Sequence, residues 1–317
     1  MNRKKKEKIR LLLIGFLSSL LLLGGTSSLS FLLENFLYAQ ISKPLEQMVI
    51  LEIPKHVFPD IEINSESALS QKITSYGKQK TLFREDSKKV LPIASLTKLM
   101  TALVIIENPE TYNFDNVITV SEKAASQDNV PIYSNLKKGE SFSIDTLFSL
   151  MMIYSSNDAA WALAEVMGPE NFVDKMNQKA QKIGLNNTYF VNPTGLDPQG
   201  VKHSEKTIHL FNRSTTTDLL NLAEYILSNQ PMIFEASMKK GPYETNNGVS
   251  SLSSGKLSFI GGKTGYTDEA GGCMVFALKN TKGDKFINII LGATSSITRI
   301  IESQKIINYI QNDPSNI

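Results

Sequence analysis

Three short motifs carry side chains that could transfer an acyl group without a catalytic histidine. A serine precedes a lysine by three residues, Ser95 and Lys98, within the run ASLTKLM at 94–100. An SSN motif at 155–157 and a KTG motif at 263–265 follow, 60 and then 108 residues further along the chain. Ser-x-x-Lys alone is common. Followed by these two motifs in this order, it indicates acyl transfer through a serine ester.

The first motif supplies the expected nucleophile and its base. We expect Ser95 at the start of a helix, where unpaired backbone N–H groups favour negative charge and suit one arm of an oxyanion hole. Lys98 then lies on the same helix face. A lysine with its ordinary pKa of about 10.4 is a poor base at neutral pH. Burial beside another cation would lower that pKa, so that Lys98 can act as the general base.

The KTG motif supplies a second cation and the groups that bind substrate. Lys263 is expected to lie near the lysine of the first motif and to bind a substrate carboxylate together with Thr264. Gly265 and the glycines at 261–262 let another backbone come close to this edge strand. The backbone N–H of Tyr266 is the candidate for the second oxyanion arm, because a pair of backbone donors is the usual arrangement.

The SSN motif is expected to connect the other two. Ser155 can relay a proton to the leaving amine. Asn157 has both a donor and an acceptor, so it can hold Lys98 and bind a substrate amide. Each motif alone is as readily a helix cap, a loop or a glycine-rich turn, so only the three together indicate this chemistry.

Other catalytic chemistries fit the sequence poorly. A Ser-His-Asp triad would have to use His56, His203 or His209, and no Gly-x-Ser-x-Gly elbow surrounds any serine. These histidines also lack the spacing of zinc ligands, so we expect no metal and no cofactor.

Hydrophobic periodicity predicts the elements that position the motifs. Apolar residues recur at helical spacing from Ser95 to Glu107, and alternating or continuous apolar runs mark the strands. Helices are expected at 95–107, 143–154, 159–167, 170–183, 217–227 and 297–310, and strands at 68–73, 80–83, 257–260, 272–278 and 286–291. Strands at both ends with helices between them predict one sheet, closed by distant segments, with a helical insertion.

Composition excludes some partners. The 317 residues are 41% hydrophobic and 20% charged, an ordinary globular balance. The net charge of +2 comes partly from the N-terminus, so the remainder offers no basic groove for nucleic acid. The one cysteine, Cys273, lies in an apolar strand and is expected to be a buried packing residue that forms no intramolecular disulfide.

The N-terminus is expected to direct export. Residues 1–10 are strongly basic, and residues 11–33 contain no charge, which is long enough to span a bilayer. Two interpretations stay open: a retained transmembrane signal anchor, which the length favours, or a secretory signal cleaved near residue 39. Residues 40–65 are then a proline-containing stalk, and 66–312 the catalytic domain. Both interpretations place that domain on the extracytoplasmic face, held at the cell membrane or secreted.

At this point the sequence resembles the serine-type D-Ala-D-Ala carboxypeptidases, the low-molecular-mass penicillin-binding proteins. The similarity extends beyond the three motifs and covers roughly residues 67–294. The runs that carry it are ASLTKLMT at 94–101, VSEKAA at 120–125, LKKGE at 136–140, SSNDAA at 155–160, FVNPTGL at 190–196 and KTGYTDEAG at 263–271.

The resemblance implies an α+β fold of the β-lactamase/transpeptidase type, an antiparallel sheet flanked by helices with an all-helical subdomain. It also implies a reaction. Ser95 would attack the bond between the last two D-alanines of a peptidoglycan stem pentapeptide, the terminal D-Ala would leave, and water would hydrolyse the acyl-enzyme. β-Lactams would acylate Ser95 as mimics of that dipeptide.

The sequence also departs from the family pattern. Many members continue into a C-terminal β-rich domain with an amphipathic anchor, whereas this chain has about 50 residues after the third motif, and membrane attachment is expected from the N-terminal segment. The rivals are a class A β-lactamase, a DD-endopeptidase or transpeptidase, and a non-catalytic wall-binding scaffold. Ser156 stands where that β-lactamase class usually has aspartate, and no Glu-x-x-Leu-Asn motif is found at the expected place.

Overall fold

A computed structural model describes residues 61–127, 135–239 and 252–317. The chain divides into two units, residues 1–57 and 58–317, and the second unit contains every described residue. The predicted basic region at 1–10, the apolar segment at 11–33 and nearly all of the predicted stalk lie outside the described residues. Among the described helices, none combines the length and the apolar character that a bilayer crossing requires.

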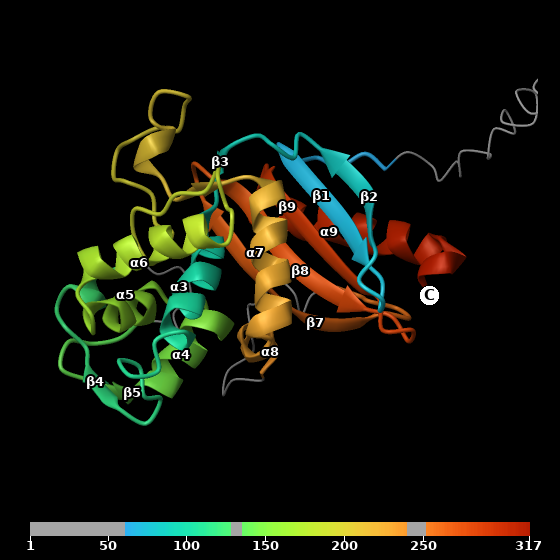
Figure 1. Ribbon diagram of the computed structural model, residues 1–317. Coiled ribbons are helices and arrows are strands. Elements are labelled where there is room, and N and C mark those ends of the chain that lie inside the picture. Colours follow the sequence, from blue (N-terminus) through green and yellow to red (C-terminus); the bar gives the residue numbers. More distant parts are fainter. Residues whose placement is uncertain (1–60, 128–134, 240–251) are drawn as a thin grey trace, which may run out of the picture. The chain divides into compact units, whose positions relative to one another are not determined.

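An antiparallel sheet of five strands forms the centre of the domain (Figure 1). Its order is β2 (Gln79–Glu85), β1 (Ser67–Ile73), β9 (Lys285–Ala293), β8 (Gly271–Lys279) and β7 (Ser258–Thr267). Strands from both ends of the described chain therefore pair side by side, as the sequence predicts. The β1–β2 hairpin contains a register shift between Ser70 and Gln71, and β7 is an edge strand.

Both faces of the sheet are covered. Helix α7 (Thr216–Asn229) packs on one face and α9 (Ser296–Asn312) on the other (Figure 1). Side chains alternate along β8, so Val275 joins the core on the α7 side while Phe276 joins the core under α9. This explains why β8 reads as a continuous apolar run instead of an alternating one.

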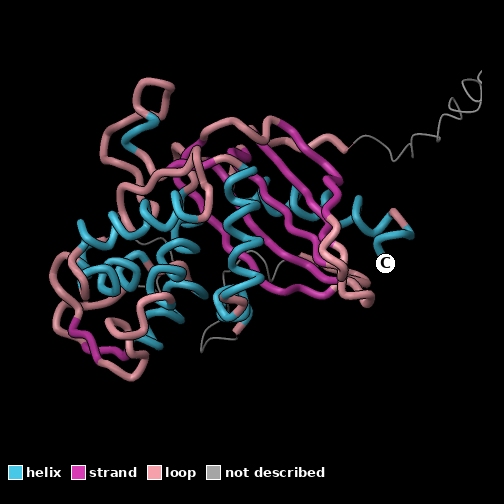
Figure 2. Tube along the Cα trace, in the orientation of Figure 1, coloured by secondary structure: helices cyan, strands magenta, loops and turns pink. Residues whose placement is uncertain are grey.

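The remaining helices gather beside the sheet (Figure 2). They are α3 (Thr97–Ile106), α4 (Ile144–Ile153), α5 (Asn157–Glu165), α6 (Pro169–Lys182) and α8 (Met232–Met238). The Ser143 side chain accepts a hydrogen bond from the Thr146 N–H and caps α4, and Gly184 ends α6 with a φ of 75°. The predicted α+β fold with a helical subdomain is confirmed.

The sequence does not predict the shortest elements. Helix α8 and two strand pairs were not expected: β3 (Leu91–Pro92) with β6 (Arg213–Ser214), and β4 (Val117–Thr119) with β5 (Ser141–Ser143). Two or three residues are too few to show periodicity.

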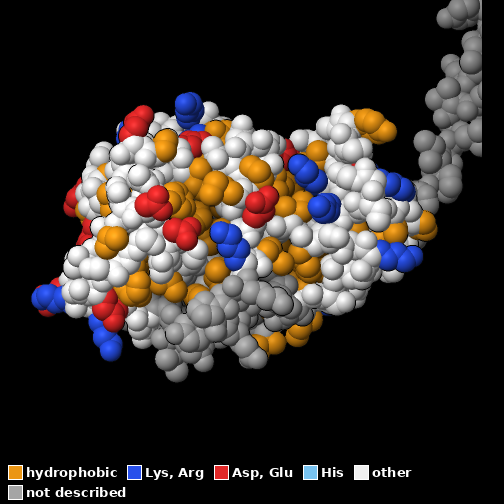
Figure 3. All heavy atoms as spheres, turned by 90° about the horizontal axis from the view of Figure 1, so that it is seen from below, with side chains coloured by type: hydrophobic (Ala, Val, Ile, Leu, Met, Phe, Trp, Pro, Cys, Tyr) orange, Lys and Arg blue, Asp and Glu red, His pale blue; other side chains and the backbone are white. Residues whose placement is uncertain are grey.

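The ends of the folded domain also lie further out than expected. Ile63 is buried, and the Asn64 N–H donates to Glu302 on α9, so the chain is already packed before residue 66. Asn316 is buried beyond the expected end at 312. On the face drawn in Figure 3, the acidic side chains lie mainly on the left half together with some basic ones, and the right half carries mainly basic ones.

Candidate active site

Ser95 lies in a tight turn that joins β3 to α3. The turn is a 3₁₀ helix over Ala94–Leu96, and α3 begins only at Thr97, so the serine precedes the α-helix instead of lying in its first turn. Ala94 has a φ of 45°, a left-handed conformation that costs energy for a residue other than glycine. Ser95 is partly exposed while its neighbours in the turn are buried. The turn therefore exposes the Ser95 hydroxyl, while the residues on either side of it are buried.

The Lys98 side chain is fully buried and makes three short contacts. Its Nζ lies 2.9 Å from Ser95 Oγ, 2.6 Å from Asn157 Oδ1 and 2.7 Å from the Thr194 carbonyl oxygen. Asn157 and Thr194 O accept hydrogen bonds here. When Lys98 is deprotonated, its amine has two N–H groups and one lone pair, so hydrogen bonds to these two acceptors would leave the lone pair for the Ser95 hydroxyl. This is the geometry that proton abstraction from Ser95 requires.

The SSN motif forms the joint between α4 and α5. Ser155 has a φ of 62°, which turns the chain sharply after α4. Its Oγ accepts a hydrogen bond from Lys263 Nζ at 2.7 Å. Ser156 caps α5 through the Ala159 N–H, and Asn157 is the first residue of that helix. The motif thus places one side chain toward each of the two buried lysines.

The KTG motif lies inside edge strand β7. Lys263 is 1% exposed, and its Nζ also donates to the Thr264 carbonyl at 2.9 Å. Gly265 lies two residues on, on the same face. A Cβ at Gly265 would stand 2.9 Å from the Ser95 nitrogen, so only glycine lets the strand come this close to the serine. Tyr266 follows on the same strand, with its side chain 42% exposed.

Burial and a neighbouring positive charge lower the pKa of both lysines. Burial, and then the positive charge of Lys263, lower the pKa of Lys98 well below its ordinary value. Burial, and then the charge of Arg299, lower the pKa of Lys263 to about 7. The low Lys98 pKa and its cationic neighbour agree with the expectation from sequence.

Arg299 is a residue of this site that the sequence analysis missed. It projects from α9, and its Nη1 donates to the Gly265 carbonyl oxygen. It lies 34 residues beyond Gly265, outside every motif, so nothing in the sequence marks it. Arg299 adds a third positive charge on the sheet side of the site.

The loop at 192–195 is the second feature that the motifs did not assign. Asn192 Oδ1 accepts from the backbone N–H groups of Thr194 and Gly195, which folds the loop so that the Thr194 carbonyl faces Lys98. The buried Asn212 side chain supports it by accepting from the Asn192 N–H and donating to the Asn192 carbonyl. A Cβ at Gly195 would lie 2.0 Å from the Ala94 oxygen, so the loop packs directly on the turn that carries Ser95.

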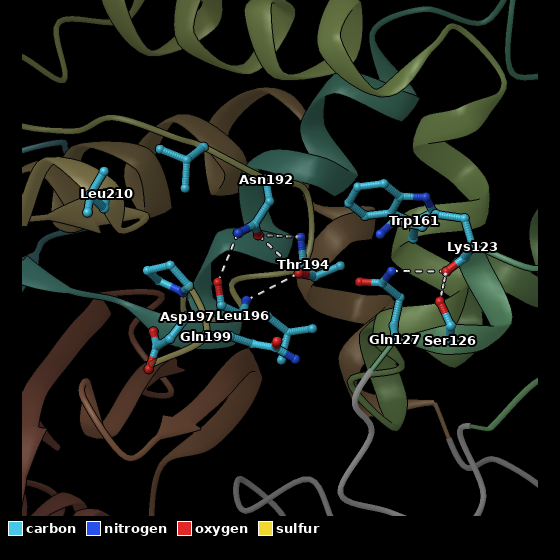
Figure 4. Close-up of a pocket in the computed structure, with 12 residues that line it drawn as sticks. Lys123, Ser126, Gln127, Trp161, Asn192, Thr194, Leu196, Asp197, Gln199 and Leu210 are labelled. Atoms are coloured by element: carbon cyan, nitrogen blue, oxygen red, sulfur yellow. Dashed lines mark hydrogen bonds between the residues drawn. The ribbon is translucent and has the colours of Figure 1, made fainter. Parts of the chain in front are cut away.

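A hollow of about 340 Å³ opens beside this loop (Figure 4). One wall is the 191–199 segment, including Asn192 and Thr194. The other wall comes from Trp161 on α5 and from Lys123 and Gln127 next to a short 3₁₀ turn. Because Thr194 lines the hollow and also accepts from Lys98, the hollow adjoins the nucleophile site.

Other reactive side chains lie apart from this chemistry. No cluster of three or more metal-ligating side chains occurs among the described residues. Burial raises the pKa of the Cys273 thiol to about 12, which keeps it protonated and inert. His209 is exposed, and the partly buried His203 ring packs against Phe211.

The fold, and a candidate nucleophile with a buried lysine beside it, are the features that point to a class of serine peptidases. The D-alanyl-D-alanine carboxypeptidase family matches residues 54–295, which is most of the chain. This protein belongs to that family.

Individual relatives agree with this assignment. D-alanyl-D-alanine carboxypeptidase DacF of Bacillus subtilis is 31% identical over 73% of this chain, and the match spans 58% of that relative's length. A D-alanyl-D-alanine endopeptidase of Pseudomonas aeruginosa is 28% identical over 79% of this chain and 78% of its own. Penicillin-binding protein D2 of Listeria monocytogenes, solved in an ampicillin-bound form, superposes with a TM-score of 0.65 at 29% identity, covering 79% of this chain and 98% of that one.

Proposed function

We propose that this protein is a serine-type D-Ala-D-Ala carboxypeptidase that removes the terminal D-Ala from peptidoglycan stem peptides. Ser95 Oγ attacks the carbonyl of the penultimate D-Ala, and Lys98 takes the hydroxyl proton. The C–N bond breaks, the departing amine receives a proton through Ser155, and water then hydrolyses the ester. The observation that carries the proposal is the buried Lys98 amine, with two acceptors that direct its lone pair at Ser95.

The sheet side of the site suits the anionic end of the substrate. Lys263 and Arg299 add positive charge beside Gly265, and the Thr264 hydroxyl lies next to them on β7. A terminal carboxylate is the group that such cations would bind. The N–H groups of Ser95 and Tyr266 are proposed as the oxyanion arms, since β7 passes within contact distance of the Ser95 nitrogen.

β-Lactams should react at the same serine, because they present a strained amide with a nearby carboxylate. The ampicillin-bound form of the Listeria protein supports this expectation. We also propose that the domain works on the extracytoplasmic face of the cell membrane, attached by residues 11–33 or released after cleavage of that segment. The support for this location is the sequence pattern and the position of peptidoglycan outside the membrane.

Endopeptidase activity is the second candidate, because the Pseudomonas aeruginosa relative carries that name. It needs the same acylation step with a different leaving amine. Incubation with a linear pentapeptide and with a cross-linked peptide dimer, each ending in D-alanine, separates the two: release of free D-Ala identifies the carboxypeptidase, and conversion of dimer to monomer the endopeptidase.

Mass spectrometry of the protein after incubation with penicillin tests the shared chemistry. We expect one penicilloyl adduct on Ser95 and none in Ser95→Ala. Rapid turnover of penicillin would indicate a β-lactamase instead, and a wild type that never acquires an adduct would indicate a non-catalytic scaffold.

A further inference from the structure

The hollow between Trp161 and the 192–199 loop has the features of a binding site for an anionic part of the substrate. Its volume of about 340 Å³ is at the small end of the range for ligand pockets, about 300–1,000 Å³, and fits a short piece of peptide. It adjoins the nucleophile through Thr194, whose carbonyl lies 2.7 Å from Lys98 Nζ. A peptide esterified to Ser95 therefore needs only its preceding residues to reach it, since each extended residue spans roughly 3.4 Å.

The charged side chains of the hollow point to a carboxylate. Lys123 Nζ lies 5.5 Å from the centre of the Trp161 ring, and no acidic side chain of the described ranges forms an ion pair with it. The acidic residues near it are engaged elsewhere. Glu122 pairs with Lys138 at 2.8 Å, and Glu165 accepts from Trp161 Nε1 at 2.8 Å.

The one carboxylate that lines the hollow is also occupied. Asp197 accepts hydrogen bonds from the Thr267 side chain and the Glu269 backbone, which tie it to the end of β7 and to the loop that follows. Figure 4 shows Asp197 on the side of the hollow opposite Lys123 and Trp161. Lys123 is therefore the charge in this hollow that is left to meet a ligand.

The wall around Lys123 is held in place by its own hydrogen bonds. Gln127 Nε2 and Ser126 Oγ both donate to the Lys123 carbonyl, at 3.0 and 2.9 Å. The bond to Glu165 fixes the indole ring, so its face stays available to the lysine. A cation held over an aromatic face beside a small polar hollow is a preorganised contact for an anion.

From this geometry we infer that the hollow is the subsite for the acyl side of the peptide, and that Lys123 over Trp161 selects a free carboxylate in the residues that precede D-Ala-D-Ala. A γ-linked D-glutamate provides such a group in its α-carboxylate. The inference rests on the proposed function, because it assigns the acyl side of the same reaction.

Two synthetic peptides that differ in one group test it. Both end in D-Ala-D-Ala, and they carry either γ-linked D-glutamate or γ-linked D-isoglutamine, so the α-carboxylate of one is an amide in the other. The ratio of their kcat/KM values, measured by release of D-Ala, reports selection for the charge. Lys123 is exposed, so we expect the wild type to prefer the acid about two- to fivefold, as a solvent-exposed ion pair allows.

Variants at the wall should change that ratio. Lys123→Ala should bring it to about one, and Lys123→Glu should favour the amide. Trp161→Phe keeps an aromatic face and should retain most of the preference. Lys175→Ala removes an exposed lysine on α6, outside the hollow, and is the matched control, which should keep both rates and their ratio.

The failures of the two proposals can be told apart. A ratio of one in the wild type, or an unchanged preference in Lys123→Ala, would overturn the subsite while D-Ala release still supports the carboxypeptidase. A wild type that releases D-Ala from neither peptide and forms no penicilloyl adduct would overturn the proposed function itself.

Discussion

The orientation of Lys98 makes a sharp prediction for Asn157→Asp. The substitution keeps the shape of the side chain but places a negative charge at the position that now lies 2.6 Å from Lys98 Nζ. Coulomb's law at an effective dielectric constant near 20 gives an attraction of about 6 kcal/mol at this distance, before the cost of desolvation. Opposite charges this close typically move a pKa by about 1–3 units. The Lys98 pKa should therefore rise by that amount in Asn157→Asp.

The sign of the effect follows from the role of the base. In the proposed mechanism Lys98 works as the neutral amine, so acylation should be present above the pKa of Lys98 and should be lost as the pH falls through it. In Asn157→Asp the rate should fall about ten- to a thousandfold at pH values below the wild-type pKa of Lys98, and it should recover at a pH about 1–3 units higher than in the wild type. An effect of the same size at every pH would contradict the prediction.

A neutral p-nitrophenyl ester is the suitable reagent, because it carries no carboxylate and its rate does not depend on binding to Lys263. The burst of p-nitrophenolate from Ser95 is followed across the pH range, with Ser95→Ala as the blank for background hydrolysis. Asn157→Ala is the control that removes the acceptor without adding charge. Its rate should drop, but the pH at which acylation is lost should not rise. If Asn157→Asp and the wild type lose acylation at the same pH, Lys98 is not the base.

Three further predictions concern the groups around Ser95. In the proposed mechanism Lys263 binds the substrate carboxylate only when protonated. Its pKa is lowered to about 7, so kcat/KM for a D-Ala-D-Ala peptide should decline above that pH, and in Lys263→Arg this decline should be absent; the same decline in both proteins would refute the assignment. Gly265→Ala should lower acylation about a hundredfold or more, with a melting temperature close to that of the wild type, because its Cβ would stand 2.9 Å from the Ser95 nitrogen; normal burst kinetics would argue against this close approach. Asn212→Ala should displace the 192–195 loop and so slow the burst about tenfold or more. An unchanged burst in a folded protein would show that the loop keeps its position without Asn212.

Sequence periodicity was a sound guide to the long elements. The three strands near the C-terminus and the helices over 144–153, 169–182 and 296–312 lie where apolar spacing predicts them, because each buries one face or two against the rest of the domain. The short strand pairs and α8 were not predicted, because they are held by tertiary contacts and have no repeating apolar pattern of their own.

The site also contains residues that the sequence predicted and residues that it did not. Ser95, Lys98, Ser155, Asn157 and Lys263 were predicted because each belongs to a motif with recognisable chemistry. Arg299, Asn212 and the Thr194 carbonyl were not, because they act through a backbone position or from a distant helix. A carbonyl oxygen is present in every residue, so only the fold shows that the one at Thr194 is aimed at Lys98.

The separation of the motifs along the chain has a physical reason. In the proposed mechanism Lys98 is a neutral base directed at Ser95, which requires two acceptors on one side of its amine and repulsion from another cation. The acceptors come from the helical subdomain and the 192–195 loop, and the cations from β7 and α9. These groups meet only where the sheet and the helices pack together. Acylation of Ser95 therefore depends on that junction as much as on the residues of any one motif, and changes that loosen the junction without touching the site should slow acylation too.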